Sequence, residues 1–285
     1  MPLPRTGPTR RALSGAVGIP TALLSALALL LALPGTAGAD GDRGHPAHPE
    51  KDWMGSTISA HEKDTSRTGT SAPQTLTASV QGVDVSSHNG NVAWATLRKS
   101  GVRFAYVKAT EGTSYRNAYF TQQYNGSYKS GMIRGAYHFG LPSSSSGAAQ
   151  AKYFLAHGGG WSKDGKTLPG ALDMEYNPYG STCYGKSAAG MVSWIADFSS
   201  TYRARTGRYP VIYTSTAWWK RCTGNASKFS SNNPLWIPNY SSSAGPLPAG
   251  WGFHTFWQYT ASGKTVGDRN RFNGALARLK VLATG

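Results

Sequence analysis

The sequence predicts an α/β fold in which a parallel β-barrel carries an incomplete outer ring of helices. Segments typical of strands alternate with segments typical of helices over residues 80–222, which indicates βαβ units and a parallel sheet. The last strand-like segments lie too close together for full crossover helices. We therefore expect a barrel with roughly eight strands but only about five substantial helices.

The pattern of apolar residues assigns each element in turn. Strands are expected at residues 80–87, 103–112, 133–140, 168–177, 209–215, 234–240 and 255–260. Helices, several of them closed by glycine, are expected at residues 92–101, 118–131, 146–160, 187–207 and 216–222.

The first 39 residues have the layout of a secretory signal peptide. A basic opening with the pair Arg10–Arg11 precedes an apolar run at residues 21–33 and small residues at 37–39. The apolar run is short for a membrane span, which needs about 20 residues. We expect cleavage before Asp40, a secreted protein and no membrane span afterwards. The arginine pair leaves both general secretory and twin-arginine export open.

Residues 40–79 are rich in polar residues, glycine and proline without apolar periodicity, so they are interpreted as a propeptide or flexible linker. Residues 80–285 are then expected to form a single domain. This domain holds the only two cysteines, Cys183 and Cys222. In an exported protein such a pair most often forms a disulfide; two free thiols are the alternative.

The same domain carries 22 Lys and Arg against 7 Asp and Glu. A strongly basic secreted protein suits a polyanionic partner. Nucleic acid and the anionic polymers of a bacterial cell wall are both candidates on charge alone.

Because acids are rare in this basic domain, the position of each one is informative about function. Asp84, Asp173 and Glu175 fall where expected strands end, and Asp268 follows the last expected strand. His138 also lies at a strand end. In α/β barrels functional side chains gather at the carboxyl ends of the strands.

Asp173 and Glu175 stand one residue apart in an apolar run, so on a strand they point to the same face. Mutual repulsion should raise the pKa of one member, and a carboxylic acid that stays protonated near neutral pH can serve as a general acid. A structural pair bridged to Lys or Arg is the alternative.

Aromatic residues make up 12% of the chain, and many lie at strand ends. They include Tyr137, Tyr176, Tyr213, Trp236, Tyr240, Trp257 and Tyr259. Aromatic faces bind sugar rings and carboxylates bind sugar hydroxyls, although many of these side chains are expected to fill the core instead.

Several stretches together resemble glycoside hydrolase family 25, the Chalaropsis-type N-acetylmuramidases, and in particular their secreted actinobacterial members. The matching stretches, in family order over nearly all of residues 80–285, are GVDVSSHNGNVAW, FAYVKATEGTSY, IRGAYHFG, LPGALDMEYN, VIYTS, FWQYT and DRNRFNG. The resemblance implies a flattened, TIM-like (β/α)5(β)3 barrel. It also implies hydrolysis of the β-1,4 bond between N-acetylmuramic acid and N-acetylglucosamine in peptidoglycan, with 6-O-acetylated muramic acid as a further substrate.

The resemblance also implies roles for individual residues. Glu175 matches the general acid and Asp173 its partner, while Asp84 and Asp268 match the other acids of the groove. Tyr137 and Gln258 match groove-lining positions, and we add His138, Tyr176, Tyr213 and Trp236 as candidate substrate-binding residues. Cys183 and Cys222 match a disulfide of close relatives. No metal or other cofactor, no nucleic-acid partner and a monomeric state are expected.

The chain departs from the family pattern at His88 and Asn89 and at Asn239, positions that bear on subsite preference. Two other readings stay open on the residues alone. One is a phosphodiesterase whose four acids hold Mg²⁺ beside a basic nucleic-acid surface. The other is a wall-binding module without activity.

Overall fold

The computed structural model describes residues 46–62, 78–262 and 266–285. The predicted signal peptide and part of the predicted linker, at residues 1–45 and 63–77, lie outside these ranges, so the structure gives no account of them.

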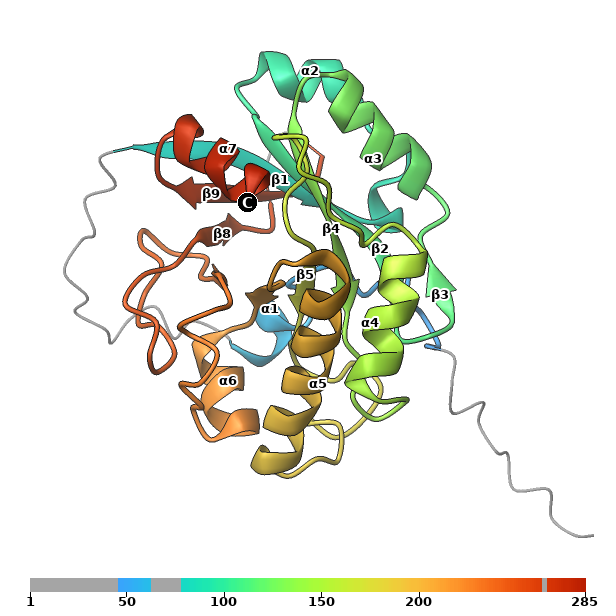
Figure 1. Ribbon diagram of the computed structural model, residues 1–285, viewed down its shortest axis with the longest axis vertical. Helices are drawn as coiled ribbons and strands as arrows, with labels where there is room; N and C mark the ends of the chain where they lie inside the picture. The colour runs from blue at the N-terminus through green and yellow to red at the C-terminus, as the bar shows by residue number, and fades with distance from the viewer. Residues whose placement is uncertain (1–45, 63–77, 263–265) are drawn as a thin grey trace, which may run out of the picture. The chain divides into compact units, whose positions relative to one another are not determined.

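One sheet closes into a barrel of eight strands, because β1 pairs with β2 as well as with β9 (Figure 1). The strands are β1 (Ser79–Val85), β2 (Phe104–Glu111), β4 (Ile133–Phe139), β5 (Ala171–Asp173), β6 (Val211–Tyr213), β7 (Leu235–Pro238), β8 (Phe256–Thr260) and β9 (Asp268–Asn273). A two-residue strand, β3 (Tyr115–Arg116), pairs with the end of β2 outside the barrel.

Strand direction decides which residues meet at the mouth of the barrel. Within the barrel, all neighbouring strands are parallel except at β9, which is antiparallel to both β8 and β1. The beginning of β9 therefore lies at the same end as the carboxyl ends of the other strands. Asp268 opens β9 rather than following the last strand, which corrects the sequence prediction; the charged, alternating pattern of residues 268–273 hid this strand.

A helix follows each of the first five barrel strands. These helices are α2 (Trp94–Lys99), α3 (Phe120–Lys129), α4 (Gly147–Ala156), α5 (Ala188–Thr206) and α6 (Thr216–Thr223). Three strands without intervening helices then complete the barrel, which confirms the (β/α)5(β)3 prediction. A further helix, α7 (Leu276–Thr284), was not predicted and packs beside β1.

The barrel interior is filled largely by aromatic rings. Phe104, Tyr106, Tyr213 and Trp236 are fully buried in one interior cluster. Gly82 makes room for them, because a Cβ there would lie 2.2 Å from the ring of Phe104. A second cluster packs the outer face of the sheet against α4 and α5, which lie side by side in Figure 1.

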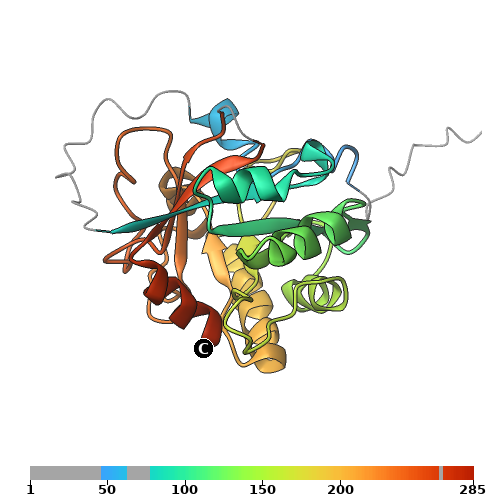
Figure 2. The ribbon, with the colours of Figure 1, turned by 90° about the horizontal axis from the view of Figure 1, so that it is seen from above.

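Residues 46–62, here called the N-terminal segment, fold against the barrel, although they fall in the predicted propeptide or linker. The segment ends in a single helical turn, α1 (Ile58–His61). Figure 2 shows α1 at the end of the barrel opposite α7. Met54 is fully buried in the interior cluster, so the segment closes the mouth of the barrel.

Candidate active site

Four acids converge at the mouth of the barrel. Asp84 lies near the end of β1, Asp173 ends β5, Glu175 follows it by two residues and Asp268 opens β9. All four are buried. Asp84 and Asp268 are direct register partners across the antiparallel pair of β1 and β9, so two carboxylates face each other on neighbouring strands.

Burial raises the pKa of every one of these acids, because a low-dielectric surrounding disfavours the charged form. The pKa of Glu175 and that of Asp84 are each raised to about 7. Burial and the charges of Asp84 and Glu175 raise the pKa of Asp268 to about 9. Burial and then the charge of Glu175 hold the pKa of Asp173 well above its usual range. The cluster can therefore keep protons at neutral pH.

An amide of β8 organises the acids on the β1 and β9 side. The Gln258 side-chain nitrogen donates to Asp84 over 3.0 Å and to Asp268 over 3.4 Å. Its oxygen accepts hydrogen bonds from the hydroxyls of Tyr213, at 2.7 Å, and Tyr240, at 2.8 Å. The two tyrosines thus fix which end of the Gln258 amide faces the carboxylates.

Asn270 gives Asp84 its shortest hydrogen bond, 2.7 Å from the Asn270 amide nitrogen. The Asn270 amide oxygen in turn accepts from the indole of Trp236 at 2.9 Å. Trp236 therefore lies beneath the acids and supports them through Asn270. Asn270 is not among the predicted site residues, and only the inward alternation of residues 268 and 270 on β9 could have indicated it.

Glu175 is surrounded by donors of the N-terminal segment. The backbone N–H of Gly55 donates to Oε1 over 2.7 Å, and that of Thr57 donates to Oε2 over 2.9 Å. The Thr57 hydroxyl also donates to Oε2. The two oxygens of Asp173, in contrast, have no hydrogen-bond partner among the described residues. The neighbours Asp173 and Glu175 thus differ sharply in environment.

Predicted groove residues Tyr137, Tyr176 and Tyr213 face the same mouth. The Tyr137 hydroxyl accepts from the N–H of Met54 at 3.2 Å, and the Tyr176 hydroxyl donates to Glu62 at 3.0 Å. The three tyrosines are the residues predicted from their strand-end positions, whereas Gln258 is the residue that the family resemblance implies.

His138 does not face the groove, which corrects its assignment as a substrate-binding residue. Because Tyr137 points into the barrel, the next side chain on β4 points outward. His138 bonds Thr110 at 2.7 Å and Gln150 at 2.9 Å, and its ring stacks on Phe198. Burial lowers the pKa of His138 to about 4, so the ring is a neutral part of the sheet–helix core.

A buried ion pair borders the acids on the β2 side. Lys108 Nζ lies 2.6 Å from Glu111 Oε2, and both side chains are fully buried. Burial raises the pKa of Glu111 to about 7, against the lowering effect of Lys108. The position of Lys108 on the inward face of β2, two residues beyond Tyr106, is the sequence signal that could have placed it here.

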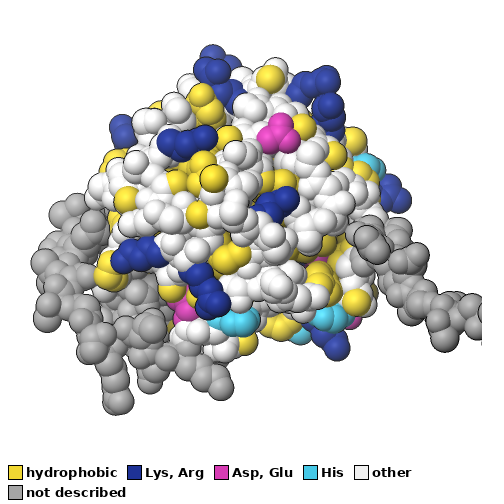
Figure 3. Space-filling model, turned by 90° about the horizontal axis from the view of Figure 1, so that it is seen from below, with side chains coloured by type: hydrophobic (Ala, Val, Ile, Leu, Met, Phe, Trp, Pro, Cys, Tyr) yellow, Lys and Arg dark blue, Asp and Glu magenta, His cyan; other side chains and the backbone are white. Residues whose placement is uncertain are grey.

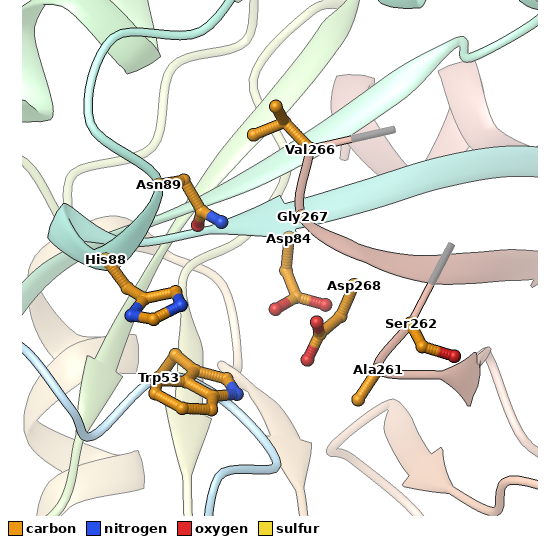
Figure 4. A pocket seen from close by; sticks show the side chains of 9 residues that line it. All are labelled: Trp53, Asp84, His88, Asn89, Ala261, Ser262, Val266, Gly267 and Asp268. Atoms are coloured by element: carbon orange, nitrogen blue, oxygen red, sulfur yellow. The ribbon is translucent and has the colours of Figure 1, made fainter. Parts of the chain in front are cut away.

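A hollow of about 240 Å³ remains beside Asp84 and Asp268 (Figure 4). Trp53 of the N-terminal segment closes one side, where its ring packs against His88 with the centroids 4.3 Å apart and the ring planes tilted by 33°. Asn89 and the residues around Gly267 line the rest. The site therefore has an open part over Asp84 and Asp268 and a filled part over Glu175.

The disulfide between Cys183 and Cys222 is present and joins the loop after β5 to α6. The bond confirms the predicted pairing. Because the loop carries Tyr176, the bond also holds one wall of the site in place. Among the described residues, no helix is both long and apolar enough to cross a bilayer.

Known proteins are similar to this chain in sequence and in fold. Residues 83–268 match the family description "Glycosyl hydrolases family 25". An N,O-diacetylmuramidase from a Chalaropsis species is 50% identical over 210 residues, which cover 72% of this chain and 100% of that protein. Lysozyme M1 of Streptomyces globisporus is 49% identical over 212 residues, covering 73% of this chain and 72% of that protein.

Solved structures agree. A muramidase from Acremonium alcalophilum is 55% identical with a TM-score of 0.72, over 72% of this chain and 99% of that one. A lysozyme from Streptomyces coelicolor is 48% identical with a TM-score of 0.71, over 73% and 98% of the two chains. The chain therefore belongs to family 25 of the glycosyl hydrolases.

Proposed function

We propose that this enzyme hydrolyses the β-1,4 bond between N-acetylmuramic acid and N-acetylglucosamine in bacterial peptidoglycan. The observation that carries the proposal is the buried pair of Asp173 and Glu175 at the barrel mouth, with both pKa values raised. Relatives that are about half identical over the whole barrel are named lysozyme and N,O-diacetylmuramidase. The second name supports 6-O-acetylated muramic acid as an additional substrate.

Glu175 is assigned as the general acid. Its pKa of about 7 leaves a large protonated fraction near neutral pH. That proton would pass to the glycosidic oxygen as the leaving sugar departs. The burial that raises the pKa also removes competing water from the reacting atoms.

Asp173 is assigned to the substrate's own 2-acetamido group. Its oxygens are buried and have no hydrogen-bond partner among the described residues, so they are available to accept the acetamido N–H. The acetamido oxygen would attack the anomeric carbon, and water would later open this intermediate with retention of configuration. Direct attack by water, with Asp84 or Asp268 as the base, would instead give inversion.

Binding of the glycan is assigned to the tyrosines around the mouth and to Gln258. The chain has a formal net charge of +16. On the face in Figure 3, Lys and Arg side chains are spread across the surface and outnumber acidic ones. Such a surface favours the anionic polymers of a cell wall. We infer that the enzyme acts outside the cell, as its predicted signal peptide implies.

The test is digestion of purified peptidoglycan by the wild-type chain and by Glu175→Gln, followed by analysis of new reducing ends. We expect muramic acid ends, with a rate loss of about 10²–10⁴-fold in the variant. Asp164→Asn, an acid-to-amide change in a turn remote from the groove, is the matched control and should keep full activity. New N-acetylglucosamine ends would contradict the assigned bond, and loss of activity in EDTA would favour the metal-dependent alternative.

A further inference from the structure

The centre of the N-terminal segment occupies the place that the proposed function gives to the glycan. The Met54 side chain is fully buried against the interior aromatic cluster. Its N–H donates to the Tyr137 hydroxyl, and its carbonyl accepts from the Gln258 side chain at 3.0 Å. Peptide N–H and C=O groups match those of acetamido substituents, so the segment uses the hydrogen bonds that a sugar would use.

The segment also engages the general acid itself. Three donors from Gly55 and Thr57 point at the two oxygens of Glu175. These hydrogen bonds occupy both oxygens of the carboxyl group that must give its proton to the glycan. The docked segment therefore opposes catalysis by filling the space over Glu175 and by occupying its oxygens.

Both flanks of the segment are anchored to the barrel. On one side, Lys108 Nζ donates to the carbonyls of Pro49, at 3.0 Å, and Asp52, at 2.5 Å. On the other, the ring of His61 stacks on Tyr176 with centroids 4.2 Å apart, and Tyr176 donates to Glu62. The contacts therefore run across the whole mouth rather than at a single point.

Gly55 occupies a position that suits only glycine. Its φ is +90°, a conformation that side chains disfavour. A Cβ there would lie 2.5 Å from the Tyr240 hydroxyl, 2.6 Å from Gln258 Oε1 and 2.8 Å from the Tyr213 hydroxyl. Since those three groups are fixed by their mutual hydrogen bonds, a larger residue would displace the segment instead of the wall.

We propose that the N-terminal segment is an intramolecular inhibitor, and that the groove admits glycan only when the segment is displaced. The inference rests on the function proposed above for this groove. The segment is joined to β1 through residues 63–78. A tethered ligand commonly has an effective concentration in the millimolar range, so dilute substrate competes poorly with it.

The test compares peptidoglycan hydrolysis by the chain from Asp40 to Gly285 as wild type, Gly55→Val and Thr57→Val. Gly55→Val should raise the rate about tenfold or more, because a segment that is docked most of the time leaves only a small active fraction. Thr57→Val removes one of the three donors to Glu175 and should give a smaller increase. Lys51→Ala changes an exposed side chain of the segment and should behave as wild type.

A synthetic peptide of residues 46–62 supplies the second measurement. Added to the Gly55→Val chain, it should inhibit in competition with peptidoglycan, and the same peptide carrying Gly55→Val should not. Wild-type and Gly55→Val chains of equal activity, with no inhibition by the peptide, would overturn the inhibitor while leaving the muramidase intact. Thermal melting checks that each variant is folded, and inactivity of all folded forms would overturn both proposals together.

Discussion

Single residues at the mouth of the barrel hold protons that an unfolded chain would release. Asp268 is the strongest case: burial, with the charges of Asp84 and Glu175, raises its pKa to about 9. An unfolded aspartate has a pKa of about 3.9. Between these two values the folded protein binds more protons than the unfolded one, so its stability falls as the pH rises.

Two buried histidines, His138 and His254, have the opposite effect on the pH dependence of stability, since burial lowers the pKa of each to about 4. Their effect ends near the unperturbed pKa of histidine, which is about 6.5.

Asp268→Asn should therefore raise the melting temperature at pH 8 and flatten its decline above about pH 6.5. The amide resembles the neutral acid and can still accept the hydrogen bond from Gln258. Each kcal/mol recovered corresponds to about 2–4 °C for a chain of this size. Melting curves from pH 5 to pH 9 would measure it. Asp164→Asn should not raise the melting temperature at pH 8, and an Asp268→Asn curve parallel to wild type would contradict the assigned pKa shift.

Residue spacing predicted much of the candidate site, but it misplaced one residue and missed another. The strand-end positions of Asp84, Asp173 and Glu175 follow from the alternation of strands and helices, and the structure brings these three acids together with Asp268. His138 fell on the wrong face because its strand was identified without its inward and outward alternation being assigned. Asn270 was missed together with β9, because its importance lies in a hydrogen bond to Asp84 that depends on the register of this strand.

At the scale of elements, the loop after β5 is braced by a covalent bond. The disulfide joins Cys183 in that loop to Cys222 in α6, across a sequence separation of 39. Closing a loop of this length removes entropy from the unfolded chain worth about 4 kcal/mol at 25 °C. The bond also fixes α6 against the loop that carries Tyr176.

Replacing both cysteines by alanine should lower the free energy of unfolding by about 4 kcal/mol and the melting temperature by about 10 °C. Thermal and denaturant unfolding of the double variant would measure the loss. Wild type treated with a reducing agent is the matched control and should shift by a similar amount. A double variant as stable as wild type would show that the bond does not constrain the unfolded chain.

The observed helices and strands show where the sequence patterns did not predict the structure. Five helices and seven strands were predicted close to their observed positions, because they follow apolar periodicity and glycine stops. The strand β9 and helix α7 were missed: β9 alternates charged and buried residues over only six positions, and α7 follows it directly. The strand β5 begins at Ala171 and ends at Asp173, although the apolar run continues beyond it.

At the scale of the whole molecule, residues 46–62 of the chain cover the mouth of the barrel, where the four buried acids lie. No periodicity in residues 46–62 indicates this, because most of the segment's hydrogen bonds to the barrel use its backbone rather than its side chains. Backbone groups are the same in every sequence, so only the folded structure could reveal the match. Residues 46–62 thus lie over the proposed hydrolytic site of the same chain.

The configuration of the first product tests most directly whether the Asp173–Glu175 pair hydrolyses the glycan through the substrate's acetamido group. Proton NMR of a soluble peptidoglycan fragment, recorded during digestion, resolves the α and β anomers before they interconvert. We predict that the β anomer forms first, as retention requires. An α anomer as the first product would contradict this claim, because it would require direct attack by water activated by a more distant carboxylate.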